Sequence, residues 1–183
     1  GVTQTLSTGA DALTSGDTDD TYDASLNSAG NQTLNSLDSI DAGAGTDTLN
    51  VQLTGSASPQ SLAGVEKLNI TASGAATLDL RNADSITEVN VLGSTATTTI
   101  NNVPVGAAIG ISDTTQDITI GSSGATGGAD AASVELASVT GAANVSLAGI
   151  EAITINSIAP NSIDLVAIDA ETLTLTGDSA ITI

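Results

Sequence analysis

The sequence predicts an all-β protein folded as a parallel β-solenoid, of the β-roll or β-helix kind, with strand and turn repeats of about 10 residues. From Leu68 onward, triplets with mainly aliphatic outer positions begin 8 to 11 residues apart, with a single gap of 16. Every middle residue of these triplets is polar or glycine, which is the period of two expected of a strand with one face on a core. Asn-Gly and Asp-Gly, which favour tight hairpins, do not occur. A hairpin-built β-sandwich remains the alternative.

The repeats predict twelve strands after residue 67. They are centred on LNI (68–70), LDL (78–80), VNV (89–91), TTI (98–100), IGI (109–111), ITI (118–120), VEL (134–136), VSL (145–147), ITI (153–155), IDL (163–165), LTL (173–175) and ITI (181–183). With two triplets per coil of about 20 residues, they make about six coils stacked over about 29 Å.

The predicted core is aliphatic, because the chain has a single aromatic residue, Tyr22. The residues expected inside are Ile70, Leu78, Leu80, Val89, Val91, Ile118, Ile120, Leu136, Leu147, Ile155, Leu165, Leu173 and Leu175. We expect the last triplet to leave the solenoid open, since no capping turn, helix or charge follows it.

Composition excludes several kinds of function. Two basic residues against twenty-one acidic ones give a net charge of −19, which excludes nucleic acid and anionic membranes as partners. No stretch is long and apolar enough to insert into a membrane. Because there is no His and no Cys, zinc sites, disulfides and imidazole-based triads are excluded, and only hard cations that bind oxygen remain.

The chain divides into an acidic Asp/Gly-rich segment, residues 1–60, and the solenoid repeats, residues 61–183. Because it opens with Gly1 rather than Met, we expect it to be part of a longer protein. LAGVEKLNI (62–70) recurs as LAGIEAITI (147–155), which predicts that Glu66 and Glu151 occupy equivalent positions at a shared turn.

The acidic segment carries the candidate metal ligands. AGAGTDTLN (42–50) matches the glycine-rich nonapeptide G-G-x-G-x-D-x-U-x, with Ala42 in place of the first glycine, and GADALTSGDTDDTYDAS (9–25) is a looser relative. Calcium suits such oxygen-rich loops and offsets the repulsion among carboxylates. The alternative is that these aspartates form turns and solvated surface. The candidate calcium ligands are Asp11, Asp17, Asp19, Asp20, Asp23, Asp38, Asp41, Gly43, Gly45 and Asp47.

Together with residues 62–70, the segments 11–25 and 34–51 resemble the calcium-binding surface-layer (S-layer) and RTX-type secreted proteins of Gram-negative bacteria. The resemblance implies secretion to the cell surface, calcium-dependent folding and a β-solenoid that self-assembles into lattices or acts as an adhesin. It also implies that Asp47 is a side-chain ligand, beside carbonyls of residues 42–46.

We therefore expect a non-enzymatic structural and assembly module whose partners are further copies of itself. The first alternative is a calcium-dependent adhesin that binds another protein, a cell-surface glycan or lipopolysaccharide. The second is a carbohydrate-active β-helix enzyme, which clustered aspartates allow but the shortage of stacking aromatics disfavours. Asp47→Ala should weaken the response to calcium more than Asp113→Ala, which lies outside the acidic segment.

Overall fold

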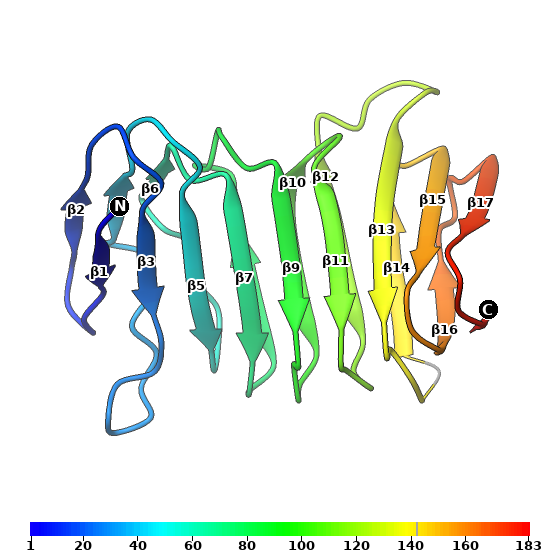
Figure 1. The fold of residues 1–183 in the computed structure, drawn as a ribbon, viewed down its shortest axis with the longest axis horizontal. Helices are drawn as coiled ribbons and strands as arrows, with labels where there is room; N and C mark the ends of the chain where they lie inside the picture. Colours follow the sequence, from blue (N-terminus) through cyan, green and yellow to red (C-terminus); the bar gives the residue numbers. More distant parts are fainter. Residues whose placement is uncertain (142) are drawn as a thin grey trace.

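The computed structural model describes residues 1–141 and 143–183, and these residues form an all-β solenoid (Figure 1). Its strands, in chain order, are β1 (Thr3–Thr5), β2 (Ala12–Thr14), β3 (Thr21–Ala24), β4 (Ser39–Asp41), β5 (Thr48–Leu53), β6 (Ser61–Ala63), β7 (Lys67–Ala72), β8 (Ala76–Asp79), β9 (Glu88–Leu92), β10 (Thr98–Pro104), β11 (Ala108–Ser112), β12 (Ile118–Ser123), β13 (Ala131–Ala137), β14 (Ala143–Ala148), β15 (Ala152–Ser157), β16 (Asn161–Val166), β17 (Thr172–Thr176) and β18 (Ile181–Thr182).

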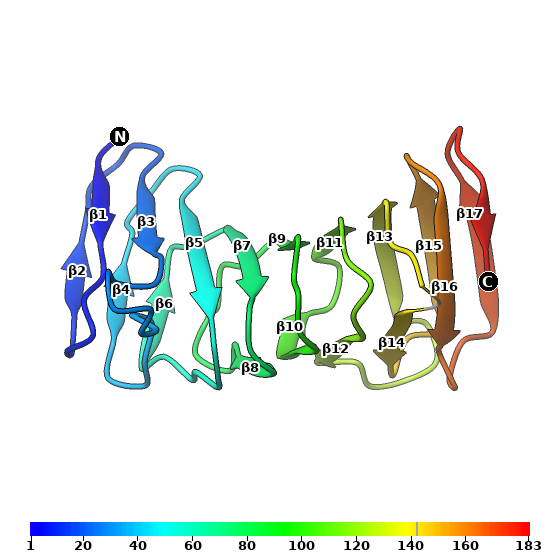
Figure 2. The ribbon, with the colours of Figure 1, turned by 90° about the horizontal axis from the view of Figure 1, so that it is seen from below.

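Odd and even strands form separate walls, as the two views in Figures 1 and 2 show. One wall is a nine-stranded sheet in the order β1-β3-β5-β7-β9-β11-β13-β15-β17, and the other comprises β2-β4-β6 and β8-β10-β12-β14-β16-β18. Every strand pair in these sheets is parallel, and each coil advances by roughly 21 residues. The β-sandwich alternative is wrong, because hairpins would pair consecutive strands antiparallel.

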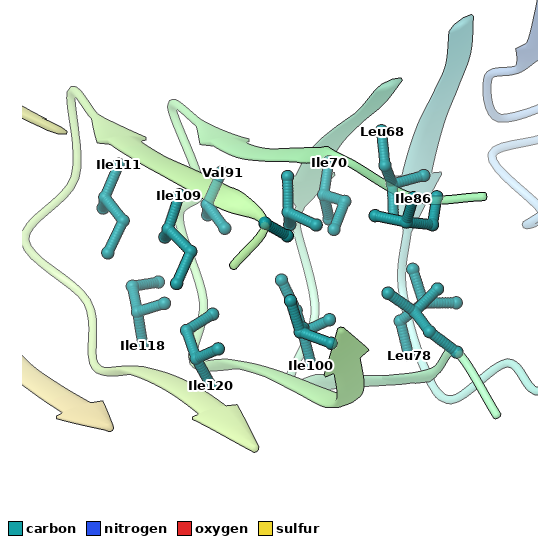
Figure 3. Packing of buried hydrophobic residues seen from close by; sticks show 14 of the residues in the cluster. Leu68, Ile70, Leu78, Ile86, Val91, Ile100, Ile109, Ile111, Ile118 and Ile120 are labelled. Carbon is teal, nitrogen blue, oxygen red and sulfur yellow. The ribbon is translucent and has the colours of Figure 1, made fainter. Parts of the chain in front are cut away.

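The core is a set of aliphatic columns between the two walls (Figure 3). In the nine-stranded sheet, Leu49, Leu68 and Val89 lie in register and are fully buried, and the column continues through Ile109 and Val134. Polar or small residues alternate with them and face outward. Burying each Leu, Ile or Val side chain contributes about 1.5–3 kcal/mol to the free energy of folding. The stacking of these side chains at equivalent positions of successive coils is therefore the main source of stability.

The core prediction is confirmed for ten of the thirteen side chains, which are at most 2% exposed. Leu165 is partly buried against the same core. Leu173 and Leu175 are 44% and 49% exposed, because β17 is an edge strand with no further coil stacked on it. At the same end, β18 pairs with β16 alone, and Ile183 is 50% exposed.

The solenoid begins at Thr3, within the acidic segment. The strands β1, β3 and β5 continue the sheet that contains β7, so residues 1–60 supply the first coils of one body.

Two connections depart from the regular coil: the one after β3 and the one between β12 and β13, which protrude at opposite sides of the body in Figure 1. The second includes most of the glycine-rich residues 121–130, which lie in the gap of 16 residues between triplets. Among the described residues no helix is long and apolar enough to cross a membrane.

Candidate metal centre

The acidic segment brings two turns into direct contact. Residues 15–20 connect β2 to β3, residues 42–47 connect β4 to β5, and the flanking strands pair in register. Ala44 donates its backbone N–H to the carbonyl of Gly16 at 3.2 Å, and the Ser15 hydroxyl donates to the carbonyl of Ala42 at 2.7 Å. The two turns therefore pack directly against each other at one end of the first coils.

Glycine is required in the second turn for two reasons. Gly43 and Gly45 have φ values of 82° and 138°, which side chains of L-residues rarely adopt. A Cβ atom on Gly43 would lie 2.4 Å from the carbonyl oxygen of Gly16, and one on Gly45 would lie 2.8 Å from the carbonyl carbon of Thr18. The turns thus pack backbone against backbone.

Two buried carboxylates lie where these turns meet β3 and β5. Asp20 and Asp47 are 2% and 0% exposed. The Asp47 Oδ1 accepts the backbone N–H of Asp20 at 2.6 Å, and the Asp20 Oδ1 accepts that of Val2 at 2.6 Å. The Oδ2 atom of each, like that of Asp130 near the other end of the solenoid, is buried and has no hydrogen-bond partner among the described residues. At Asp20 the Ser15 hydroxyl and the Val2 N–H hold the pKa of the carboxyl below its ordinary value, so this group is an anion at neutral pH. Two buried anionic oxygens without a donor are costly unless a cation or a proton reaches them.

The hydroxyl of Tyr22 lies on the core side of the same turns. It hydrogen-bonds the hydroxyl of Ser15 at 2.7 Å, and the ring is fully buried. Burial raises the pKa of Tyr22, and the negative charges of Asp20 and Asp47 raise it further. Sequence reasoning did not assign Tyr22 to this centre. Its register with the aliphatic Leu49 of the nonapeptide becomes visible only in the structure.

The structure separates the ten predicted ligands into groups. Asp17, Asp19, Asp20, Gly43, Gly45 and Asp47 lie in the two stacked turns, and Asp41 immediately precedes the second. Asp19 is exposed and accepts the backbone N–H of Thr46 at 2.8 Å, which ties one turn to the other. Asp17 and Asp41 are exposed.

The remaining candidates lie elsewhere. Asp11 and Asp38 precede β2 and β4, at the opposite ends of these strands from the stacked turns. Asp38 is buried, but its two oxygens accept the backbone N–H groups of Asp11 and Asn35, and burial raises its pKa. Asp23 lies within β3 and accepts the N–H and hydroxyl of Ser25. These three carboxylates already have local hydrogen-bond partners.

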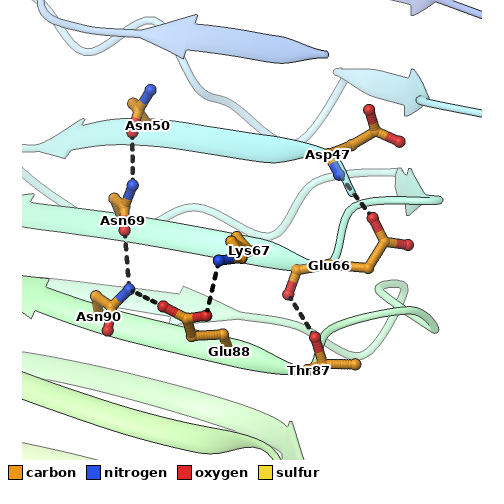
Figure 4. Close-up of polar contacts among 8 residues, drawn as sticks. All are labelled: Asp47, Asn50, Glu66, Lys67, Asn69, Thr87, Glu88 and Asn90. Carbon is orange, nitrogen blue, oxygen red and sulfur yellow. Dashed lines mark hydrogen bonds and ion pairs between the residues drawn. The ribbon is translucent and has the colours of Figure 1, made fainter. Parts of the chain in front are cut away.

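Asp20 and Asp47 belong to a longer array, which we call the carboxylate column. Its members are acidic residues immediately before odd-numbered strands: Asp20, Asp47, Glu66, Asp130, Glu151 and Glu171. Within it, Glu66 Oε2 accepts the N–H of Asp47 at 2.8 Å, and Glu151 Oε2 accepts that of Asp130 at 2.9 Å (Figure 4 shows the first). The predicted equivalence of Glu66 and Glu151 is confirmed, since both bind the backbone of the preceding coil.

The centre has few charged groups. The part of the chain that the structure describes contains no group of three or more His, Cys, Asp or Glu residues placed to hold a metal ion. A cation at the stacked turns would therefore be bound by at most two carboxylates, with backbone carbonyl and hydroxyl oxygens completing its shell. Hard cations with irregular coordination, of which calcium is the usual example, accept such a ligand set.

Comparison of the chain with protein-family models, with curated proteins and with solved structures found no match.

Proposed function

We propose that this chain is a structural module of a secreted bacterial surface protein, of the surface-layer kind, whose first coils are stabilised by calcium. The observation that carries the proposal is the pair of buried Oδ2 atoms of Asp20 and Asp47, which lack a hydrogen-bond partner in the described residues. Calcium supplies the positive charge that these oxygens lack.

The residues present fit calcium better than a smaller or softer ion. Asp20 and Asp47 would supply carboxylate oxygens, and carbonyls of residues 15–20 and 42–47 would supply neutral ones. Magnesium prefers a strict octahedron and retains its waters, and zinc prefers nitrogen or sulfur ligands, so both suit this set less well. Asp17, Asp19 and Asp41 are exposed at the edge of the stacked turns. Their negative charges would attract the ion, although these side chains are not buried.

The small number of charged ligands also supports an extracellular location. Calcium affinity rises with the charge and rigidity of the site, and sites of extracellular modules have dissociation constants of about 10⁻⁴–10⁻³ M. A centre with two buried carboxylates belongs with such weak sites, which fill at the calcium concentrations outside cells and stay empty at the submicromolar concentrations of the cytosol. Calcium would then couple folding of the first coils to export.

A structural role is supported by two carboxylates, Glu88 and Asp79, whereas burial raises the pKa of a third, Asp38. A general acid working near neutral pH needs a raised pKa. The Asn90 amide and the Lys67 ammonium lower the pKa of Glu88 on the outer face of the nine-stranded sheet. The Arg81 guanidinium lowers the pKa of Asp79 to about 2. These side chains are suited to holding structure as permanent anions.

Thermal unfolding with and without calcium tests the proposal. At free calcium 100 times its dissociation constant, the folded state should gain about 2.7 kcal/mol, which raises the Tm by roughly 5–10 °C. Asp47→Asn keeps an acceptor for the Asp20 N–H but removes the charge, and it should abolish most of this gain.

The matched control is Asp164→Asn. Asp164 is exposed in β16, far along the solenoid from the stacked turns. It is preferable to Asp113, whose φ of 53° adds backbone strain to any Ala substitution. An equal calcium response in wild type, Asp47→Asn and Asp164→Asn would contradict the proposal.

A further inference from the structure

A row of asparagine side chains runs along the outer face of the nine-stranded sheet (Figure 4). Asn50, Asn69 and Asn90 are in register on β5, β7 and β9. The Nδ2 of Asn69 donates to the Oδ1 of Asn50 at 2.8 Å, and the Nδ2 of Asn90 donates to the Oδ1 of Asn69 at 3.0 Å. Each amide thereby supplies the donor that its neighbour needs.

The row is interrupted on β11, where Gly110 is in register with Asn90 on one side and Glu135 on the other. A Cβ atom on Gly110 would lie 2.3 Å from the Oδ1 of Asn90, so this oxygen reaches over the glycine. No donor among the described residues binds it. Beyond the gap the row resumes, because Asn156 donates its Nδ2 to Glu135 at 3.0 Å.

The gap forms a hollow of about 260 Å³. Its walls include Glu88 and Asn90 on β9 and Ser133 and Glu135 on β13, and its floor is Ala108 and Gly110. A second hollow of about 220 Å³ shares Asn90, Gly110 and Glu135 and extends along β11 to Leu92 and Ile158. These two apolar side chains are 40% and 52% exposed. The result is a trough with hydrogen-bond acceptors at one end and apolar groups at the other.

The charges favour a cationic occupant. Glu88 and Glu135 face the trough from opposite walls, and the nearest cation, the Lys67 Nζ, is 3.2 Å from Glu88 Oε2. Glu135 has no ion-pair partner within the described residues. Each of the two hollows is smaller than a drug-sized ligand pocket, so the pair suits one side chain and a neighbour of that side chain. A guanidinium presents N–H donors on several edges, and so reaches acceptors on two walls at once.

We propose that the trough over Gly110 binds an arginine side chain of a partner protein, with an apolar neighbour of that arginine packed on Leu92 and Ile158. The guanidinium lies between the Asn90 Oδ1 and the Glu135 carboxylate, where the amide of an asparagine would lie if β11 had one in place of Gly110. This inference does not depend on the stacked turns or on calcium.

The test is a titration of the ¹⁵N-labelled chain with the capped peptide acetyl-Gly-Arg-Leu-amide, followed by NMR at low salt. The expected shifts are confined to the backbone and amide signals of residues around Gly110, including Asn90 and Asn156. Replacing arginine by citrulline, which has the same shape without the charge, should weaken binding about three- to fivefold, as for a partly exposed ion pair.

Three variants locate the binding. Glu135→Gln removes one charge and should weaken binding by a similar factor, while Glu171→Gln, an exposed residue outside the trough, should leave it unchanged. Gly110→Asn supplies the missing side chain and should abolish binding. Gly110 does not have a left-handed φ, and the atom that its new Cβ meets belongs to a side chain that can rotate, so this variant is expected to fold.

The proposal is overturned if the citrulline peptide binds as well as the arginine peptide. It is also overturned if the shifts spread over the acidic surface with equal midpoints, or if Glu135→Gln and Glu171→Gln weaken binding equally. Gly110→Asn with a wild-type circular dichroism spectrum and unchanged binding would likewise contradict it.

Discussion

At the scale of single residues, acidic side chains in this protein serve as acceptors for the backbone of a neighbouring coil. In the carboxylate column, Asp20, Asp47, Glu66 and Glu151 each accept an N–H group that lies just before a strand of the preceding coil. Such charge-assisted hydrogen bonds are stronger than neutral ones. Part of the net charge of −19 therefore has a structural use, despite the repulsion it brings.

Glu66→Ala tests this use. It removes the acceptor of the Asp47 N–H, and leaving that group without a partner should cost about 1–3 kcal/mol in the free energy of unfolding. The control is Glu171→Ala, which removes the same charge at an exposed position and should change stability by no more than about 0.5 kcal/mol. Urea denaturation measures the loss of stability in both variants. Equal losses would show that Glu66 affects stability through its charge and not through its hydrogen bond to the Asp47 N–H.

Asp79 makes the free energy of unfolding depend on pH in the acidic range. Hydrogen bonds from Arg81 and from the Asn102 Nδ2 hold the pKa of Asp79 at about 2, below its ordinary value of 3.8. A lowered carboxyl pKa stabilises the folded state fully above pH 3.8, and this contribution disappears as the pH falls through about 2. Asp79→Asn should be less stable than wild type at pH 5, and the difference should shrink below pH 3.8. A difference that stays constant from pH 5 to pH 2 would contradict the assignment.

At the scale of elements, strands with aliphatic triplets could be predicted from the sequence, and the shortest strands of the acidic segment could not. All twelve triplets lie in or overlap strands, because alternation with period two reflects one buried face. By contrast, β1 (TQT) and β2 (ALT) are three residues long and carry little of this pattern. They are strands because neighbouring coils pair with them, which is a tertiary effect.

The candidate site was predictable in part for a similar reason. The nonapeptide located Asp47, Gly43 and Gly45 correctly in a turn. Its partner turn is residues 15–20, which lie within the looser relative 9–25 and are aligned with 42–47. The sequence hides this alignment, because Ser15 and Thr18 stand where the motif has glycines and Tyr22 stands where it has an aliphatic residue. The carboxylate column likewise becomes visible only once the register between coils is known.

Stacking of the turns can be tested with two glycines. Gly43→Ala combines a left-handed φ with a contact of 2.4 Å to the Gly16 carbonyl oxygen, whereas Gly30 has a φ of 77° and nothing within 4 Å of a new Cβ. Gly30→Ala should cost about 1–2 kcal/mol from backbone strain alone. Gly43→Ala should cost about 1–3 kcal/mol more from overpacking. Equal losses in thermal unfolding would mean that the turns are not packed as described.

At the scale of the whole molecule, the solenoid is quasi-one-dimensional, since each coil contacts mainly its neighbours. The last coil exposes the edges of β17 and β18 together with Leu173 and Leu175. Free strand edges and exposed leucines promote association with other chains.

We expect this chain to self-associate through its last coil. The double variant Leu173→Lys, Leu175→Lys places charge on the exposed edge strand and should shift the sedimentation profile toward monomer. A matched control is Leu37→Lys, since Leu37 is 63% exposed in the long connection between β3 and β4. If the control dissociates the assemblies as strongly as the double variant, association does not occur through this end.

A crystal structure grown with saturating calcium shows whether the ion is bound where the two N-terminal turns stack. We expect an anomalous difference peak bonded to a carboxylate oxygen of Asp20 or Asp47 and to carbonyl oxygens of residues 15–20 or 42–47. A map in which calcium lies elsewhere, or in which both Oδ2 atoms are bound by protein donors or water alone, would contradict it.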